Sequence, residues 1–259
     1  MSDLVAELFE QELRRRGVQC RFDEDELRYR VQHQGRELLV SLDNLARNYA
    51  REQDVACVAS FVDNLLSLYR RVEGQSWEEV RGLILFAIEP SDYAEPLPLR
   101  SPISDRVDRV PVIVRAPLQT VSFITPTMVD TWQVSRAEVE TTASRNLAAA
   151  LTAAKLEYGD VDGVRLGYLG TELPIKAALI LAPNLREVVS PVLGWPLYAV
   201  IPDRDFLYLW ASRHQSLIDR VGRTVVKEFA TAPYPITTEV FEISDDGIRP
   251  IGAYSPESA

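Results

Sequence analysis

Residues 110–147 read VPVIVRAPLQTVSFITPTMVDTWQVSRAEVETTASRNL and carry the strongest structural signal in the chain. Two segments rich in β-branched residues, 111–115 and 118–125, are separated by a short Ala-Pro break and predict a β-hairpin. Thr125 followed by Pro126 has the form of a helix cap with proline at the first helical position. This segment therefore predicts two paired strands that lead into a short helix.

A long helix is predicted next. Ser135 and Glu138 have the spacing of a capping box, in which a serine side chain and a glutamate side chain satisfy the first backbone N–H groups. The Ala-rich sequence behind them continues to about Lys155. A second informative segment, YAVIPDRDFLYLW at 198–210, predicts strands over 197–201 and 206–210 around a polar turn.

The other elements of the C-terminal part follow from shorter patterns. Apolar runs predict two further strands, a weak helix, a final amphipathic helix, and an edge strand before a fraying tail. These expectations cover, in that order, 164–169, 175–181, 185–193, 215–230 and 239–243.

The N-terminal part predicts a helix, an antiparallel three-stranded meander and further helices. Apolar residues at helical spacing stop at Gly17, and alternating residues then run to Val40 with turns at 23–26 and 34–35. A helix that starts at Asp54 and another with a capping box at Ser76 follow, the latter predicted to end at Pro90. We expect a shared core made of Leu8, Phe22, Tyr29, Val31, Val58, Val62 and Leu65.

Residues 90–109 carry four prolines and no periodicity, which predicts an irregular surface connection. The predicted organisation is therefore an N-terminal part over 1–89, this connection, and a C-terminal α+β domain over 110–259. Strands joined by hairpins and grouped apart from helices indicate the α+β class. We expect mainly antiparallel sheets, with helices packed on one face, in two halves.

Composition excludes several classes of protein. The chain has 259 residues and a formal net charge of -10, which disfavours general binding to nucleic acid because phosphate is repelled. No segment has the ~20 apolar residues of a membrane span, and no secretory signal pattern is present. The two cysteines, Cys20 and Cys57, have neither redox nor zinc spacing, which favours buried thiols in a reducing compartment. We expect a cytoplasmic protein.

A search for catalytic chemistry yields no motif. The chain has no phosphate-binding glycine loop and no nucleophile elbow. Its two histidines, His33 and His214, lie far apart in sequence, which is unfavourable for a zinc enzyme. Acidic runs such as 23–26 lack the pattern of a calcium loop. We therefore predict no catalytic residue, no metal and no cofactor.

One polar cluster is the candidate binding site: Asp203, Arg204 and Asp205, placed between two apolar strands. In one interpretation Arg204 is a binding group for a partner or substrate, positioned by a neighbouring acid. In the other, favoured one, turn chemistry explains the proline and the aspartates, and Arg204 pairs with a carboxylate of its own domain.

These segments also carry a resemblance. The pieces are Phe123-Ile124-Thr125, then Trp132 with the capped helix from Ser135 through Asn146-Leu147, then the turn at 201–205. They resemble the uncharacterised bacterial YtpQ-like family, a domain of unknown function, over roughly the C-terminal 150 residues. The Ala-rich segment 148–154 and the proline-rich connection depart from its pattern. The resemblance implies no catalytic residue.

Three functions are compatible with these observations. The favoured one is a non-enzymatic protein-binding or adaptor module with a protein partner. An immunity-type or chaperone-like protein that masks a basic partner is an alternative, since the acidic surface would suit it. The third is an enzyme with a site of arginine and acidic residues and no metal. Oligomeric state and partner identity do not follow from the sequence.

Overall fold

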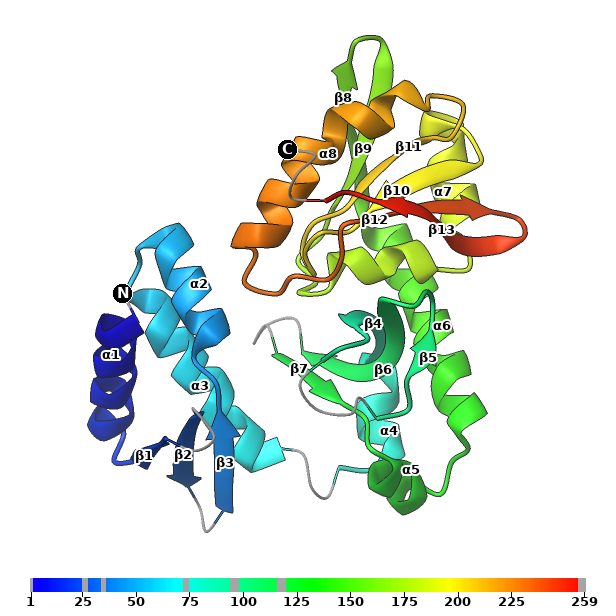
Figure 1. Ribbon diagram of the computed structural model, residues 1–259. Coiled ribbons are helices and arrows are strands. Elements are labelled where there is room, and N and C mark those ends of the chain that lie inside the picture. Colours follow the sequence, from blue (N-terminus) through cyan, green and yellow to red (C-terminus); the bar gives the residue numbers. More distant parts are fainter. Residues whose placement is uncertain are drawn as a thin grey trace. The chain divides into compact units, whose positions relative to one another are not determined.

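The computed structural model describes residues 2–24, 28–33, 36–71, 75–93, 98–115 and 120–255, and the chain divides into two compact units (Figure 1). The first comprises Met1–Gln75 with Thr231–Pro233, and the second comprises Ser76–Ala230 with Tyr234–Ala259. The boundary predicted from the sequence was residue 89. The segment just before that boundary is a strand of the second unit, so the division falls earlier in the chain.

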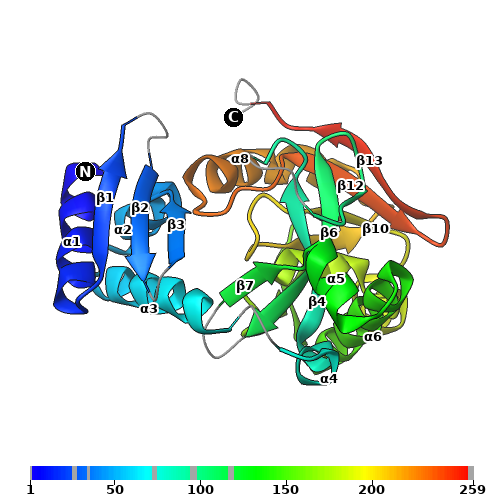
Figure 2. The same ribbon diagram turned by 90° about the horizontal axis from the view of Figure 1, so that it is seen from below.

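The first unit is a three-stranded antiparallel sheet with helices on one face (Figure 2). The sheet order β1-β2-β3 confirms the predicted meander. The predicted turns at 23–26 and 34–35 lie partly or wholly outside the described residues. The elements are α1 (Ser2–Arg15), β1 (Gln19–Asp23), β2 (Arg28–His33), β3 (Arg36–Val40), α2 (Asp43–Glu52) and α3 (Ala56–Arg71).

The core of the first unit agrees with prediction at six of the seven named positions, five of them fully buried and Leu8 partly buried. Phe22 is the exception, with 49% of its surface exposed. It lies on β1, at an edge of the sheet, and its ring makes only an edge contact with Tyr29, 5.3 Å between centroids. Phe9 of α1 takes the inner position against Tyr29, at 5.2 Å, so Phe22 lies at the rim of the core.

The second unit contains a four-stranded sheet built around β6 (Val107–Arg115). One edge of β6 pairs with β4 (Ile84–Pro90), and the other edge is shared by the short β5 (Ser101–Pro102) and β7 (Thr120–Phe123). The pairing of β6 with β7 confirms the predicted hairpin, whose turn lies outside the described residues. The residues 90–109 are therefore not wholly irregular, because β5 and the start of β6 fall within them.

The predicted helix from Ser76 to Pro90 is wrong beyond its first turn. The capping box exists, with the Ser76 N–H donating to Glu79 Oε2 at 2.7 Å, but α4 (Trp77–Val80) is followed only by the 3-10 turn η1 (Arg81–Leu83). The chain then enters β4, in which six consecutive residues are buried. A strand that is buried on both faces is apolar at nearly every position, so its sequence has no periodicity. The helical spacing of apolar residues in this run therefore does not indicate a helix.

Two helices link the sheets of this unit. The short helix α5 (Pro126–Trp132) begins as predicted, since Thr125 Oγ1 accepts from the Met128 N–H at 3.3 Å. The long helix α6 (Arg136–Ala153) also begins as predicted, with Ser135 Oγ accepting from the Glu138 N–H at 3.1 Å. Side-chain capping is local in sequence, and for that reason both starting points could be predicted.

A six-stranded antiparallel sheet completes the second unit, in the order β13-β12-β10-β11-β9-β8. The segment 175–181, predicted as a strand, is instead a buried 3-10 segment. The strand β8 (Lys155–Val161) was not predicted. The tail forms a hairpin, and its first strand, β12 (Glu239–Ser244), is internal to the sheet and is not the predicted edge strand. The elements are β8 (Lys155–Val161), β9 (Val164–Gly170), η3 (Lys176–Leu181), α7 (Leu185–Leu193), β10 (Leu197–Val200), β11 (Tyr208–Ala211), α8 (Ser216–Thr231), β12 (Glu239–Ser244) and β13 (Gly247–Ala253).

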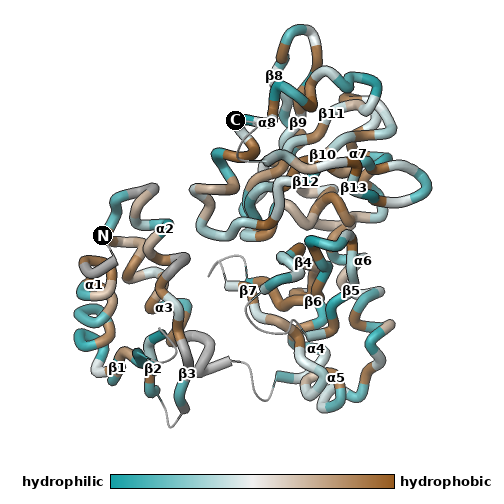
Figure 3. The backbone as a smooth tube through the Cα atoms, viewed as in Figure 1, coloured by the Kyte–Doolittle hydropathy of each residue, from teal (hydrophilic) through white to brown (hydrophobic). Residues whose placement is uncertain are grey.

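Both faces of the six-stranded sheet are covered by apolar packing. Leu197 and Ala199 of β10 belong to the main core with β4, β6 and α7, whereas Tyr198 and Val200 pack with α8 on the other face. Hydrophobic segments run along β4 and β6 in Figure 3. The α+β class with antiparallel sheets is confirmed. In the first unit the helices pack on one face of the sheet, as predicted. In the second unit, helices pack on both faces of the six-stranded sheet.

Candidate functional site

The turn that carries the predicted binding residues is fixed by Asp203. Its side chain is 3% exposed, its Oδ1 accepts from the Asp205 N–H at 2.6 Å, and its Oδ2 accepts from the Tyr234 N–H at 3.3 Å. A backbone bridge between Asp203 and Pro235 joins the turn to the segment before β12. Asp203 therefore has a structural role as an acceptor for buried backbone donors. Asp205 is exposed.

Arg204 is held by its backbone and stacks on an aromatic ring. Its N–H donates to the Tyr234 carbonyl at 3.1 Å, and its carbonyl accepts from the Ala177 N–H of η3 at 3.0 Å. The guanidinium lies 3.7 Å from the centroid of the Tyr234 ring. Its Nε is buried and has no hydrogen-bond partner. Among the described residues Arg204 forms no ion pair, so the expected carboxylate partner within its own domain is not present there.

Glu89 is a candidate that was not predicted. It lies near the end of β4 and is only 8% exposed. Burial raises the pKa of its carboxyl to about 7, and the positive charge of Arg204 only partly opposes this effect. Glu89 has no hydrogen-bond or ion-pair partner within the described part of the chain. The available signal was that Glu89 is the one charged residue in the run LILFAIEP.

Asp108 is the cross-strand neighbour of Glu89. The two residues face each other in the pairing of β4 with β6, so their side chains leave the same face of the sheet. Asp108 is 4% exposed, and its Oδ2 is 3.3 Å from the Arg100 guanidinium. Asp108 therefore has a cation of its own, which Glu89 lacks. The charge of Arg204 opposes the rise in the pKa of Glu89, so residues from two segments distant in sequence influence each other here.

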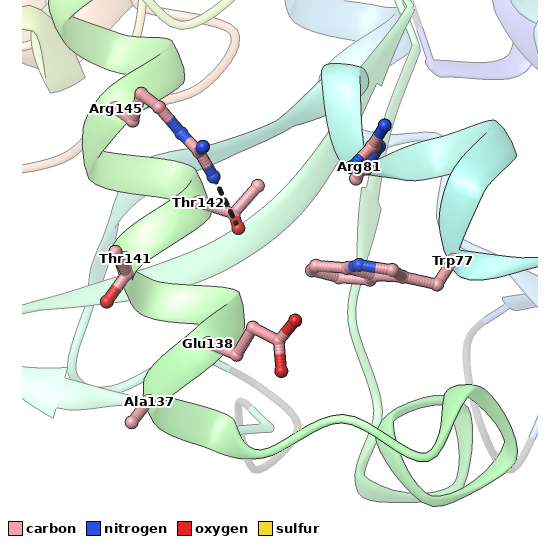
Figure 4. Close-up of a pocket in the computed structure, with 7 residues that line it drawn as sticks. All are labelled: Trp77, Arg81, Ala137, Glu138, Thr141, Thr142 and Arg145. Carbon is pink, nitrogen blue, oxygen red and sulfur yellow. Dashed lines mark hydrogen bonds between the residues drawn. The ribbon is translucent and has the colours of Figure 1, made fainter.

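A second candidate is an open pocket, here called the Trp77 pocket, with a volume of about 460 Å³ (Figure 4). One wall is α4 with η1, and the other wall is α6. Its lining residues are Trp77, Arg81, Ala137, Glu138, Thr141, Thr142 and Arg145. In Figure 4 the Trp77 indole projects toward α6. The guanidinium groups of Arg81 and Arg145 lie toward one end of the pocket, and the Glu138 carboxylate lies toward the other.

The walls of the Trp77 pocket are held at a fixed separation. Nδ2 of Asn146, on α6, donates to the carbonyls of Arg81 at 2.7 Å and Ile84 at 2.8 Å. The Trp77 ring also packs on Trp132, with 5.7 Å between ring centroids. These contacts connect the helix to the opposite wall independently of the pocket's own polar groups. The pocket is therefore preorganised.

The charged groups of the Trp77 pocket keep donors available. Arg145 donates to Thr142 Oγ1 at 3.2 Å, which uses one of its five N–H groups. Arg81 pairs with Glu78 at 2.9 Å, but both side chains are more than half exposed, so the pair is weak. An aromatic surface flanked by two guanidinium groups and one carboxylate can bind an apolar side chain and an acidic group together.

Other chemistry receives no support from the described residues. Within them no group of three or more His, Cys, Asp or Glu side chains is placed to hold a metal ion. Cys20 and Cys57 form no disulfide, and both are half-buried rather than fully buried as expected. No helix in the described ranges is long and apolar enough to cross a membrane.

Comparison with protein-family models, with curated proteins and with solved structures finds no significant match to this chain. The YtpQ-like resemblance therefore stays a prediction, and the function has to be argued from the geometry of the sites alone.

Proposed function

We propose that the protein is a non-enzymatic protein-binding module whose partner docks in the Trp77 pocket. The observation that carries this proposal is the half-buried Trp77 indole, which lines the pocket with two arginines and Glu138 on a preorganised frame. Tryptophan and arginine are the residue types most enriched where truncation costs the most binding energy in protein interfaces. A rigid pocket also lowers the entropic cost of binding.

The pocket suits a partner segment that presents an apolar or aromatic side chain next to a carboxylate. The apolar group would cover the Trp77 ring, and the carboxylate would accept from Arg145 and Arg81, whose planar forks match its two oxygens. Glu138 at the other end would accept from a backbone N–H or a basic side chain of the same segment. The net charge of the chain, -10, would repel acidic segments that lack the apolar anchor.

A second candidate is a module that masks a basic partner, favoured by the same net charge of -10. The two functions differ in their dependence on salt. Masking by general charge weakens strongly as ionic strength rises, because exposed charges are screened beyond ~8 Å at physiological salt. Docking in a pocket with an apolar anchor depends less on salt.

Arg145 is the decisive position for a test. It is exposed and makes one side-chain hydrogen bond, so its replacement leaves the fold intact. The immobilised wild-type chain first captures partners from an extract of the native host. Each captured partner is then quantified, purified, and titrated against wild type and against three variants: Arg145→Ala, Arg145→Glu and Arg223→Ala. Arg223, an exposed arginine of α8, is the matched control.

We expect Arg145→Ala to weaken the interaction at least ~10-fold, Arg145→Glu to abolish it, and Arg223→Ala to preserve it. Trp77→Ala should also abolish binding, but it removes packing on Trp132 and so serves as support only. If all variants bind the partner with equal affinity at high salt, the proposal that the partner docks in the Trp77 pocket is refuted. If Arg223→Ala weakens partner binding as much as Arg145→Ala does, and binding falls steeply as salt increases, the masking function is favoured.

A further inference from the structure

The side chain of Arg204 has an unusual combination of partners. Its guanidinium lies over the face of Tyr234, at 3.7 Å from the ring centroid, and that contact uses none of its hydrogen-bond donors. Its buried Nε has no acceptor. A buried N–H without an acceptor is costly, and native structures contain few such groups.

Glu89 complements Arg204. It is a buried carboxyl with no hydrogen-bond partner among the described residues, and it lies close enough to feel the charge of Arg204. Yet the two groups do not form an ion pair within 4 Å, in contrast to Asp108 on the same sheet, which pairs with Arg100. A purely structural pair would be expected to close this gap, since both groups would gain.

Four segments that are distant in sequence are linked in this region. The Arg204 carbonyl accepts from Ala177 of η3, η3 packs against β4, and β4 carries Glu89. Tyr234, in the segment before β12, supplies the ring. The backbone around Arg204 is fixed by Asp203, which holds the turn through two backbone donors. Both side chains therefore extend from backbone that is fixed by hydrogen bonds or sheet pairing.

The geometry points to a binding site for a small oxyanion, a carboxylate or a phosphate, held by the Arg204 guanidinium near Glu89. The stacked ring fixes the plane of the guanidinium, so that its N–H edge presents paired donors to two oxygens. Glu89 in its protonated form offers an O–H donor to the same anion. This site is independent of the Trp77 pocket and of the proposed partner.

Sodium acetate and inorganic phosphate are the probes for this site. The full chain is titrated with each at pH 6.0 and constant chloride, by calorimetry and by the ¹⁵N resonance of the Arg204 Nε–H group. The variants are Arg204→Gln, Arg204→Lys and Glu89→Gln, with Arg223→Gln as the control. Tryptophan fluorescence confirms that each variant is folded, and Arg204→Lys keeps the charge while it removes the fork.

We expect saturable binding of at least one probe with a shift of the Arg204 resonance, and a loss of about tenfold or more in both Arg204 variants. Glu89→Gln should bind within a few-fold of wild type, because the amide also donates. Acetate without phosphate would identify a carboxylate ligand, and phosphate without acetate a phosphorylated one. Absence of saturable binding of both probes would overturn the proposal, and so would unchanged affinity in Arg204→Gln.

Discussion

Replacement of Glu89 by glutamine should make the second unit more stable at alkaline pH. Glu89 is buried on β4, and burial raises the pKa of its carboxyl from 4.5 to about 7. A raised carboxyl pKa means that the fold disfavours the ionised form. The destabilisation is absent below pH 4.5, grows as the pH rises, and is complete above about pH 7. The charged groups that face Glu89 are Arg204, which lowers the pKa, and Asp108 across the strand pair.

The size of the effect follows from the two pKa values. A carboxyl with a pKa of 4.5 in the unfolded chain and about 7 in the fold reduces the free energy of unfolding by about 3 kcal/mol at pH 8. At pH 5 the same group reduces it by about 1 kcal/mol. Glutamine has nearly the same shape and does not titrate. The stability of Glu89→Gln relative to wild type should therefore increase by about 2 to 3 kcal/mol between pH 5 and pH 8.

Urea unfolding followed by tryptophan fluorescence is the appropriate assay, because all four tryptophans (Trp77, Trp132, Trp195 and Trp210) belong to the second unit. The control is Glu187→Gln, which makes the same chemical change at an exposed position of α7. If the difference between Glu89→Gln and wild type is the same at pH 5 and pH 8, Glu89 is not buried in the way that the structure shows.

Three further substitutions test the framework by the same unfolding assay. Ser135→Ala removes the cap of α6 and should lower the free energy of unfolding by about 1 kcal/mol, whereas no loss would mean that the cap is not formed. Asp203→Ala leaves two backbone donors without an acceptor and should cost about 3 kcal/mol, and a cost below about 1 kcal/mol would contradict its structural role. Asn146→Ala should cost about 2 kcal/mol and also weaken partner binding at the Trp77 pocket, although Asn146 does not line it; unchanged affinity would show that the walls do not need this link.

Elements whose backbone groups are satisfied locally could be predicted from the sequence. The caps at Thr125 and Ser135 depend on residues three positions away, and both were placed correctly. The meander of the first unit and the pairing of β10 with β11 also follow from alternation and turn residues. In each case the side chains that determine the element are close together in sequence.

Elements buried on all sides could not be predicted in the same way. β4 and η3 are both continuous apolar runs within the main core, and one was assigned as a helix and the other as a strand. Periodicity arises from contrast between a buried and an exposed face, and these segments have no exposed face. Their conformation is set by partners distant in sequence, such as β6 for β4.

The assignment of β4 also explains why half of the candidate site was missed. The turn residues around Arg204 identified it as a candidate. Nothing in the local sequence indicates that Arg204 stacks on the ring of Tyr234, or that its charge acts on the carboxyl of Glu89. As part of a helix, Glu89 would have been an ordinary residue of the last turn. As the penultimate residue of a buried strand it is an ionisable group in an apolar environment, and that is a property of functional sites.

β4 also connects the two candidate sites. It begins at Ile84, whose carbonyl is bound by Asn146 behind the Trp77 pocket, and it reaches Glu89 near its other end. Five residues of extended chain place these points about 17 Å apart. That separation is about twice the screening length at physiological salt, so exposed charges at one site have little electrostatic effect at the other. Loss of partner binding on substitution of Arg145, and loss of anion binding on substitution of Arg204, would therefore be independent observations about two separate sites.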